Sequence, residues 1–297
     1  MDAAIVTEQL TKMYGTVVAL DGLDLRVERG EIFGFLGPNG AGKTTTIRLL
    51  LDLIRPTSGR ATVLGHDCRR ESRSVRASIG YLPGDLRLYG DLTGEQTVRL
   101  VSGLRATPPD PAFVRALVAA LELDLSPRAA AYSKGNRQKL GLVLAMMSRP
   151  PVLLLDEPTS GLDPIMQHVV WELLRAEAGR GCTVFLSSHV LSEVEETCER
   201  VGMLRSGRLV AVEPVASLRG RGRRIVVTFA ADEPAPDLAL AGTRVIERRN
   251  HTVALEAAGD LDPLVKSLAR YHVVDFRTEQ PSLEDVLLGY YREEARR

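Results

Sequence analysis

Residues 37–45 have the types and the spacing of a phosphate-binding loop. The segment reads GPNGAGKTT and fits the pattern G-x-x-x-x-G-K-[ST], with an apolar run before it and a helical segment after it. Glycines let the backbone curl so that N–H groups point at phosphate oxygens, and the following helix adds the partial positive charge of its N-terminus. Lys43 supplies a point charge for β- and γ-phosphates, and the Thr44 hydroxyl can bind Mg²⁺. We therefore expect nucleotide phosphates to bind at Gly37, Pro38, Asn39, Gly40, Ala41, Gly42, Lys43, Thr44 and Thr45.

Two adjacent carboxylates follow a second apolar run. Asp156 and Glu157 come directly after Val152–Leu155, which reads VLLL. Asp156, at the end of a strand, can hold the Mg²⁺ shell, and Glu157 points elsewhere and can act as a general base toward the attacking water. Two acids at a strand end could also form a solvated turn. With a phosphate loop upstream, we interpret them as the hydrolytic half of a nucleotide site.

Short apolar runs alternate with helical segments from residue 1 to about 215, and these are the elements that must position the site. The runs Ile32–Leu36, Val152–Leu155 and Thr183–Ser187 are typical of buried parallel strands, and Thr44–Ile54 indicates the helix after the loop. Strands that alternate with helices predict an α/β layered fold.

Residues of about 86–147 lack strand signals and predict a helical insert. Asp110-Pro111 is a plausible cap and first-turn pair for one of its helices. Further along, Ser192-x-x-Glu195 resembles a capping box that would open another helix.

The composition changes at residues 219–224, which read RGRGRR. A nucleic-acid patch is one interpretation, but no aromatic residue interleaves with the arginines, so a solvated linker is favoured. We therefore expect an ATPase-like domain at 1–218, a linker at 219–224 and a small α+β accessory domain at 225–297. Its expected strands are Ile225–Phe229, Thr243–Glu247, Thr252–Glu256 and Val273–Phe276, and its expected helices are Leu261–Ala269 and Ser282–Arg292.

The overall composition narrows the class of protein. Lys+Arg and Asp+Glu are both 38, which gives a net charge of zero and does not indicate a nucleic-acid partner. Cys68, Cys182 and Cys198 are scattered, as expected for reduced thiols in a cytosolic protein. We expect neither a signal peptide nor a membrane-spanning segment, so any membrane role would come from a partner.

The phosphate loop and the two carboxylates, together with a third motif between them, give the chain a resemblance to the ATP-binding subunits of ABC transporters. That family carries an LSGGQ-like signature shortly before the second carboxylate motif, and the matching residues here read YSKGNRQ, from Tyr132 to Gln138. Ser133 and Gly135 fit the signature, whereas Tyr132, Lys134 and Asn136 depart from it. By this resemblance, Ser133 and Gly135 bind a γ-phosphate, for which a hydroxyl and bare backbone amides at a helix start are suited.

Other motifs follow in the family's order over residues 3–215. Asp156–Pro164, reading DEPTSGLDP, matches the carboxylate motif and the D-loop. His189 matches the switch histidine and is expected to act with Glu157 in catalysis, and Tyr14 matches the aromatic residue that stacks on adenine. The resemblance implies an ABC-type P-loop ATPase core that uses ATP and Mg²⁺, with Thr44 and Asp156 at the metal.

The resemblance also implies partners. Two copies should face each other head to tail, with each ATP between the phosphate loop of one copy and Ser133 and Gly135 of the other. The homodimer should drive a separate transmembrane permease, which places the chain in the cytoplasm at the inner face of the membrane. The tail, with Gln280–Val286 and Gly289–Tyr291, is similar to drug-resistance exporters of the daunorubicin type, which implies export of a drug, antibiotic or lipid-like molecule.

One family position departs from the pattern. The Q-loop glutamine should follow Ile79–Pro83, where this chain has Gly84 and Asp85. Two interpretations stay open: Asp85 takes over the contact to Mg²⁺ or water, or it is only a turn residue.

Other classes of nucleotide-binding protein fit less well. ABC ATPases that act on DNA carry a long coiled-coil insert, and those that act on ribosomes carry two ATPase cassettes; we recognise neither in this sequence. A nucleotide kinase needs an acceptor site and a lid, and no motif here indicates them. A regulatory ABC ATPase that is not coupled to transport is the remaining alternative; Glu157 and His189 argue against a non-hydrolysing binder, whereas Gly84 keeps it open.

Overall fold

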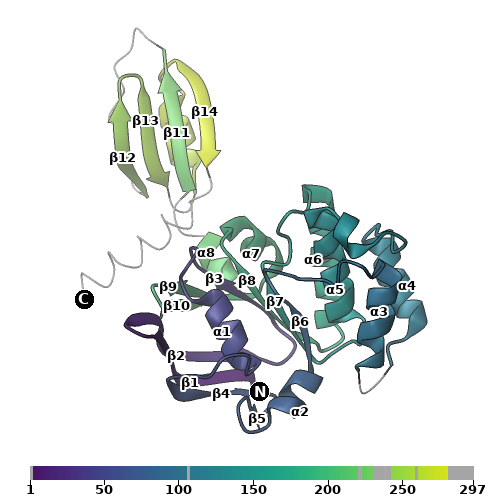
Figure 1. Cartoon of the computed structure of the whole chain (residues 1–297). Coiled ribbons are helices and arrows are strands. Elements are labelled where there is room, and N and C mark those ends of the chain that lie inside the picture. The colour runs from purple at the N-terminus through teal and green to yellow at the C-terminus, as the bar shows by residue number, and fades with distance from the viewer. Residues whose placement is uncertain are drawn as a thin grey trace. The chain divides into compact units, whose positions relative to one another are not determined.

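The computed structural model describes residues 3–105, 108–219, 223–230, 238, 242–257 and 260–279 of the 297. The chain divides into two compact units, Met1–Glu213 and Pro214–Arg297. Each unit has its own sheets and is described by itself (Figure 1).

A six-stranded sheet with the order β10-β9-β3-β8-β7-β6 forms the centre of the first unit. The pairs β3–β8, β3–β9, β7–β8 and β6–β7 are parallel, which confirms the expected α/β arrangement. The predicted strands at Ile32–Leu36, Val152–Leu155 and Thr183–Ser187 are all present, the last two one residue longer than expected. The strands are β3 (Ile32–Leu36), β6 (Ile79–Leu82), β7 (Val152–Asp156), β8 (Thr183–Ser188), β9 (Arg200–Arg205) and β10 (Arg208–Pro214).

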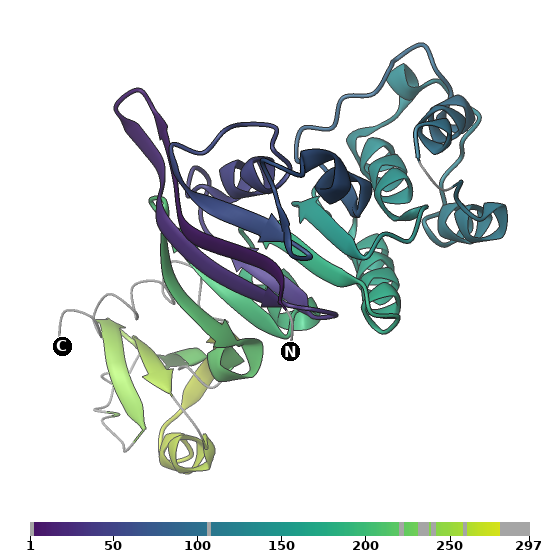
Figure 2. The same ribbon diagram turned by 90° about the horizontal axis from the view of Figure 1, so that it is seen from below.

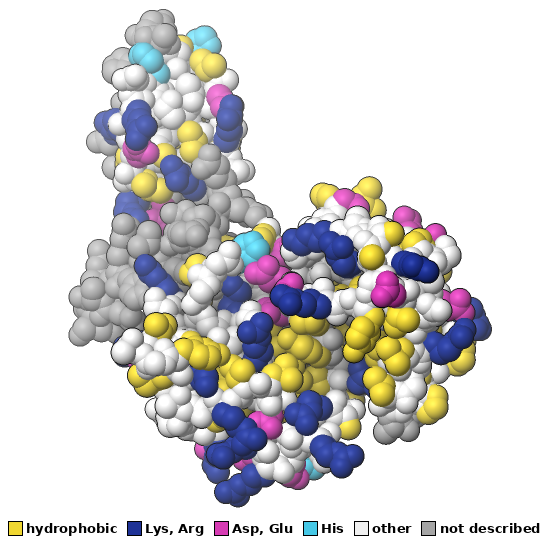
Figure 3. All heavy atoms as spheres, in the orientation of Figure 1, with side chains coloured by type: hydrophobic (Ala, Val, Ile, Leu, Met, Phe, Trp, Pro, Cys, Tyr) yellow, Lys and Arg dark blue, Asp and Glu magenta, His cyan; other side chains and the backbone are white. Residues whose placement is uncertain are grey.

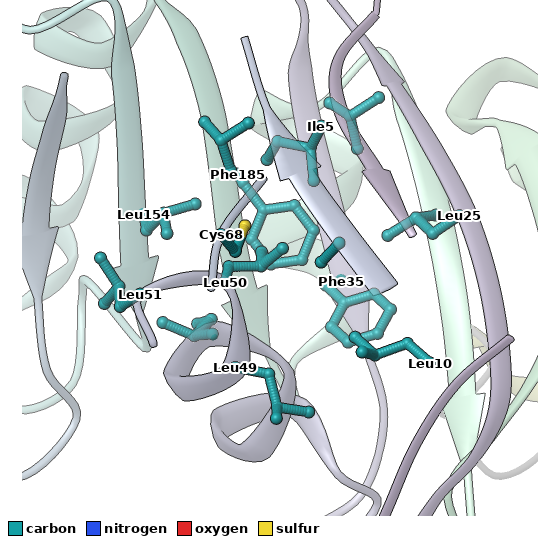
Figure 4. Close-up of a cluster of buried hydrophobic side chains, with 14 of the residues drawn as sticks. Ile5, Leu10, Leu25, Phe35, Leu49, Leu50, Leu51, Cys68, Leu154 and Phe185 are labelled. Carbon is teal, nitrogen blue, oxygen red and sulfur yellow. The ribbon is translucent and has the colours of Figure 1, made fainter. Parts of the chain in front are cut away.

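A second, antiparallel sheet with the order β2-β1-β4-β5 lies beside this layer (Figure 2). Apolar side chains from both sheets and from the helix after β3 form one core, in which the rings of Phe35 and Phe185 are 5.2 Å apart (Figure 4). The strands are β1 (Ala3–Tyr14), β2 (Val17–Glu28), β4 (Ser58–Val63) and β5 (His66–Asp67). The core therefore fixes the phosphate-loop strand against the strand that ends at Tyr14.

The helix after the phosphate loop, α1 (Lys43–Leu50), is shorter than the predicted Thr44–Ile54. Asp52 has φ 52°, and its N–H and that of Leu53 bond back to the last turn of the helix. Aspartate tolerates this left-handed conformation better than most residues, and such a residue ends a helix.

In the described part of residues 86–147 the regular elements are helices, and the strand-like pairing is one isolated bridge between Thr93 and Arg128. Asp110 caps the second helix through the N–H of Ala112, with Pro111 in the first turn, which confirms that prediction. The elements are α3 (Gly94–Gly103), α4 (Pro111–Ala120), the 3₁₀ turn η1 (Ala129–Ala131) and α5 (Lys134–Met146).

The predicted capping box at Ser192 and Glu195 is wrong. Helix α7 (Leu191–Thr197) begins before Ser192, and its N-cap, Val190, has no side-chain capping bond. Ser188, rather than the expected Ser192, bonds the backbone where the helix begins. Its hydroxyl lies two residues before Val190 and accepts the Val190 N–H at 2.9 Å. The remaining helices of the unit are α2 (Ser72–Ala77) and α6 (Pro164–Ala178).

The second unit contains a four-stranded antiparallel sheet with the order β12-β13-β11-β14. The four strands and the helix expected near Leu261 are present, and Ile225, Val227 and Phe229 pack with Leu264 and Leu268 in its core. Of the predicted linker 219–224, Arg219 ends α8 and Arg223 and Arg224 begin β11. Residues 220–222 and the predicted helix Ser282–Arg292 lie outside the described residues. The elements are α8 (Val215–Arg219), β11 (Arg223–Phe229), β12 (Thr243–Arg249), β13 (Thr252–Ala257), α9 (Asp262–Leu268) and β14 (Val273–Glu279).

Two further expectations concern the state of the cysteines and the presence of a membrane-spanning segment. The three cysteines are free and buried, and burial raises the pKa of the Cys68 and Cys182 thiols to about 12. Over the described ranges, no helix is both long and apolar enough to cross a membrane.

Gly59 is expected to be essential for the register of the antiparallel sheet. Its φ is +78°, and a Cβ there would lie 2.1 Å from the backbone oxygen of Gln9, where the β1–β4 register shifts. Gly59→Ala should lower the free energy of unfolding by about 3 kcal/mol, from left-handed strain plus overpacking. Gly65→Ala is the matched control, because its φ is +86° and its Cβ would meet nothing within 4 Å. Equal losses in urea denaturation would show that the Gln9 contact is unimportant.

Candidate functional site

The carboxyl ends of three adjacent parallel strands bring the predicted residues together. Leu36 at the end of β3 pairs with Ser188, and Asp156 at the end of β7 pairs with Ser187. The loops that follow these strands therefore emerge at the same edge of the sheet, which is where α/β folds bind ligands.

The phosphate loop follows β3 and has the backbone shape that its glycines predict. Gly40 and Gly42 have φ of +79° and +113°, and a Cβ on Gly37 would lie 2.4 Å from the backbone oxygen of Leu204. The loop and the start of α1 form the wall of a hollow, lined by Ala19, Asn39, Gly40, Ala41, Gly42, Lys43, Thr44, Thr45 and Glu157.

Lys43 is a buried cation in this loop, with 5% of its surface exposed. Its Nζ donates to the backbone oxygens of Gly37 at 2.5 Å and Pro38 at 3.2 Å. Burial lowers the pKa of Lys43, and the nearby carboxylates of Glu157 and Asp156 oppose this effect only in part. The ammonium is thus held at the rim of the hollow by neutral acceptors, an environment that an anionic ligand would improve.

Asp156, at the end of β7, is hydrogen-bonded to the start of α1 and to the end of β8. One carboxylate oxygen accepts from the Thr44 hydroxyl at 2.7 Å and the other from the Ser187 hydroxyl at 2.5 Å. A carboxylate beside a hydroxyl is the hard-oxygen donor set that suits Mg²⁺ when phosphate oxygens and waters complete the shell. The described residues hold no cluster of three or more His, Cys, Asp or Glu side chains that could bind a metal.

Glu157 turns away from Asp156 because its backbone is left-handed, with φ 51°. Its N–H donates to the backbone oxygen of Ser187 at 3.2 Å and to the Ser187 hydroxyl at 3.1 Å. Its carboxylate lies 2.8 Å from Nδ1 of His189 and also lines the hollow. The pair predicted from the sequence, a base and a switch histidine, is therefore in direct contact.

Gln138 contributes to this loop, a role that the sequence reasoning missed. From the buried face of α5, its Nε2 donates to the backbone oxygens of Glu157 and Pro158, both at 2.9 Å. The available signal was an amide side chain on the apolar side of a predicted helix, since buried polar groups are nearly always hydrogen-bonded.

Ser133 and Gly135 do not line the hollow. Ser133 is the N-cap of α5, and its hydroxyl accepts the N–H of Asn136 at 3.1 Å. A Cβ on Gly135 would lie 3.0 Å from the backbone oxygen of Gly161. Gly135 therefore lies against the loop after Glu157, and the binding of a γ-phosphate by Ser133 and Gly135 stays a prediction.

Tyr14 also lies apart from the hollow, at the end of β1. Its side chain is 48% exposed, and the ammonium of Lys12 lies 4.8 Å from the ring centroid. An exposed ring is free to stack on a base, and this role too stays a prediction.

Gly84, rather than Asp85, is the residue next to the carboxylate centre. A Cβ on Gly84 would lie 3.1 Å from Oδ2 of Asp156. The Asp85 side chain is 74% exposed and pairs with Arg87 at 3.1 Å. Of the two interpretations left open for Asp85, the structure favours the turn residue.

Comparison with known proteins gives consistent matches. The profile of the ABC transporter family matches residues 20–160. The daunorubicin resistance ATP-binding protein DrrA3 of Streptomyces coeruleorubidus is 40% identical over 234 residues, which cover 77% of this chain and 74% of that protein. The protein DrrA2 of the same organism, with the same description, is 36% identical over 303 aligned residues, covering 96% of this chain and 94% of the relative. A solved ATP-binding subunit of an ABC transporter superposes with a TM-score of 0.67 at 30% identity, covering 73% of this chain and 92% of the other.

Lys43→Met should separate stability from ligand binding. Removing a buried cation should leave the melting temperature at pH 7 unchanged or higher, whereas affinity for ATP should fall by about 30-fold or more. Because the folded-state pKa lies below the ordinary 10.5, the wild type should gain stability as pH rises between these two values, and the variant should not.

Thermal melts at several pH values and titration with ATP measure both effects. Lys266→Met, at an exposed lysine of the second unit, is the control and should change neither. Unchanged ATP affinity in Lys43→Met would contradict the assignment of the loop.

Proposed function

The chain belongs to the ATP-binding subunits of ABC transporters, which are ATPases, and we propose that it hydrolyses ATP with the residues at the ends of β3, β7 and β8. One observation carries the assignment: a single hydrogen-bonded centre links Thr44, Asp156 and Ser187 and places Glu157 beside His189. This centre adjoins the hollow formed by the phosphate loop.

The binding half of the site comes from the phosphate loop. Backbone N–H groups of the loop and the N-terminus of α1 receive the phosphate oxygens, and Lys43 exchanges its bonds to backbone carbonyls for the β- and γ-phosphates. Thr44 and Asp156 would hold Mg²⁺, which would neutralise charge on the phosphate oxygens.

The hydrolytic half comes from the loops after β7 and β8. Glu157 accepts a proton from water as the water oxygen attacks the γ-phosphorus, and the bond from that phosphorus to the β–γ bridging oxygen breaks. The products are ADP and inorganic phosphate. His189 holds the Glu157 carboxylate at 2.8 Å, and through Glu157, which lines the hollow, it can respond to the γ-phosphate.

ABC ATPase cassettes in general act as dimers together with transmembrane permeases. In the dimer proposed here, Ser133 and Gly135 of one copy complete the site of the other. Their absence from the lining of their own hollow supports this arrangement. The exposed start of α5 is then available to a γ-phosphate from a second copy.

A surface for the permease lies next to the Gly84 loop. Hydrophobic side chains gather over β6 and α3 on the face shown in Figure 3. Tyr89, Leu100 and Leu104 are exposed in this part of the chain. Large apolar patches of this kind favour a protein partner, and a permease seated here would anchor the chain at the inner face of the membrane.

The relatives support a class of cargo. Both Streptomyces relatives are described as daunorubicin resistance proteins, and DrrA2 aligns through the second unit as well. We therefore assign the transporter to export of drug-like or antibiotic molecules. Stimulation of ATP hydrolysis by daunorubicin in the assembled complex tests this class of cargo.

Glu157→Gln should bind ATP normally but hydrolyse it at least about 100 times more slowly, because an amide keeps the shape of the side chain and cannot accept the proton of water. With ATP and Mg²⁺ the variant should accumulate as a dimer in light scattering. Glu8→Gln, at an exposed glutamate paired with Arg60, is the control and should behave as wild type. Normal turnover without a dimer would refute both the base role and the composite site.

Gly84→Ala should lower Mg²⁺-dependent ATP hydrolysis by about tenfold, since the added methyl group would press on Asp156 and displace it. Asp85→Ala should have little effect, because its side chain points to solvent and to Arg87.

The comparison should be made for the isolated subunit and for the complex with its permease, which we expect to accelerate hydrolysis by ordering residues 84–89. If Asp85→Ala abolished the acceleration of hydrolysis by the permease, the interpretation that Asp85 takes over the contact to Mg²⁺ or water would be restored. A permease that gave no acceleration would refute coupling through this loop.

A further inference from the structure

Glu193 forms a bridge between the two loops that carry the hydrolytic residues. One of its carboxylate oxygens accepts from the Thr159 hydroxyl at 2.7 Å, and the other accepts from the Ser188 hydroxyl at 2.6 Å. Thr159 and Ser188 are 2% and 1% exposed, so both bonds lie inside the protein.

Each end of the bridge is adjacent to a hydrolytic residue. Thr159 lies two residues after Glu157, in a turn where the N–H of Ser160 donates to the backbone oxygen of Glu157 at 3.1 Å. Ser188 directly precedes His189, and its hydroxyl also accepts the Val190 N–H at 2.9 Å. Movement of Glu193 would therefore move both partners of the Glu157–His189 contact.

The other bonds between these loops lie closer to the sheet. Among the described residues, they join the Glu157 N–H and the Asp156 carboxylate to Ser187, at the very ends of β7 and β8. Beyond that point, the Glu193 carboxylate and the Glu157–His189 contact itself hold the loops together. Bonds to an ionised acceptor are shorter and stronger than those between neutral groups, and two of them on one carboxylate fix both distance and direction.

We propose that Glu193 is a positioning residue for ATP hydrolysis, which holds Glu157 and His189 in contact by tying Thr159 to Ser188. This inference rests on the hydrolytic roles given to Glu157 and His189 above. Glu193 itself reaches neither of them through a hydrogen bond, so its effect on the reaction passes through the two loops.

Substitution of Glu193 should reduce turnover without reducing ATP binding, because its hydrogen bonds go to Thr159 and Ser188 rather than to the phosphate loop or Asp156. Glu193→Ala should lower kcat by about 10- to 100-fold, the range expected when a reacting group is misplaced by about 1 Å. Affinity for ATP should stay within about twofold of wild type. Glu193→Gln keeps one acceptor oxygen, and its amide can donate to the Ser188 hydroxyl, so it should retain an intermediate kcat.

Glu196→Gln is the matched control on the same helix. Glu196 pairs with His168 at 2.9 Å on the protein surface, and its loss leaves the bridge intact. Its kcat should equal that of wild type. If Glu193→Ala fails to fold, Glu193→Gln and Thr159→Val test the same bridge with smaller changes.

A double-variant cycle separates positioning from a merely structural role. If Glu193 acts by holding His189 against Glu157, Glu193→Ala should have little further effect on kcat once His189 is replaced by alanine. Full additivity, an unchanged kcat in Glu193→Ala, or a loss of ATP affinity and melting temperature in parallel with kcat would overturn the proposal. Glu157→Gln is measured beside them: if it is inactive while Glu193→Ala is normal, only the bridge is refuted, and if it is active, the hydrolytic site itself is refuted.

Discussion

The hydrogen-bonded carboxylate of Asp156 is the contact on which the arrangement of the site depends. It accepts one hydroxyl from the start of α1 and another from the end of β8, while its own backbone ends β7. A carboxylate that is 98% removed from solvent is costly unless its oxygens are bonded, so Thr44 and Ser187 offset the cost of placing it there. The same bonds tie the start of α1 to the ends of β7 and β8, from which the loops of Glu157 and His189 emerge.

Lys43, by contrast, is a buried charge whose desolvation is only partly compensated by its hydrogen bonds and by nearby carboxylates. Its ammonium bonds neutral carbonyls of Gly37 and Pro38, and burial still lowers its pKa despite two nearby carboxylates. Such a group is a cost in the free protein that an anionic ligand repays by supplying opposite charge. The loop is thus preorganised for phosphate because its curvature is fixed by glycines and by the contact of Gly37 with Leu204.

The parts of the site that sequence predicted are those set by local chemistry. Glycine spacing determines the loop, and acids after apolar strands determine the placement of Asp156 and Glu157, so both followed from the residue pattern. The contact of Gly84 with Asp156 and the bridge made by Glu193 depend on which strands are neighbours, which no local pattern states. The prediction that Ser192 caps a helix was wrong for a related reason. The Ser188 hydroxyl, four residues earlier, accepts the N–H of Val190 just before the helix begins.

Gly84 changes how this site can respond to a partner. The family pattern has a glutamine at this position, a long side chain that can adjust by rotation about its own bonds. Here a Cβ alone would lie 3.1 Å from the carboxylate, so the backbone of Gly84 itself lies close to Asp156. Any displacement of residues 84–89 therefore alters the surroundings of Asp156 directly, without a flexible intermediate. Because Asp156 is bonded to both Thr44 and Ser187, that displacement reaches the phosphate loop and the histidine loop together.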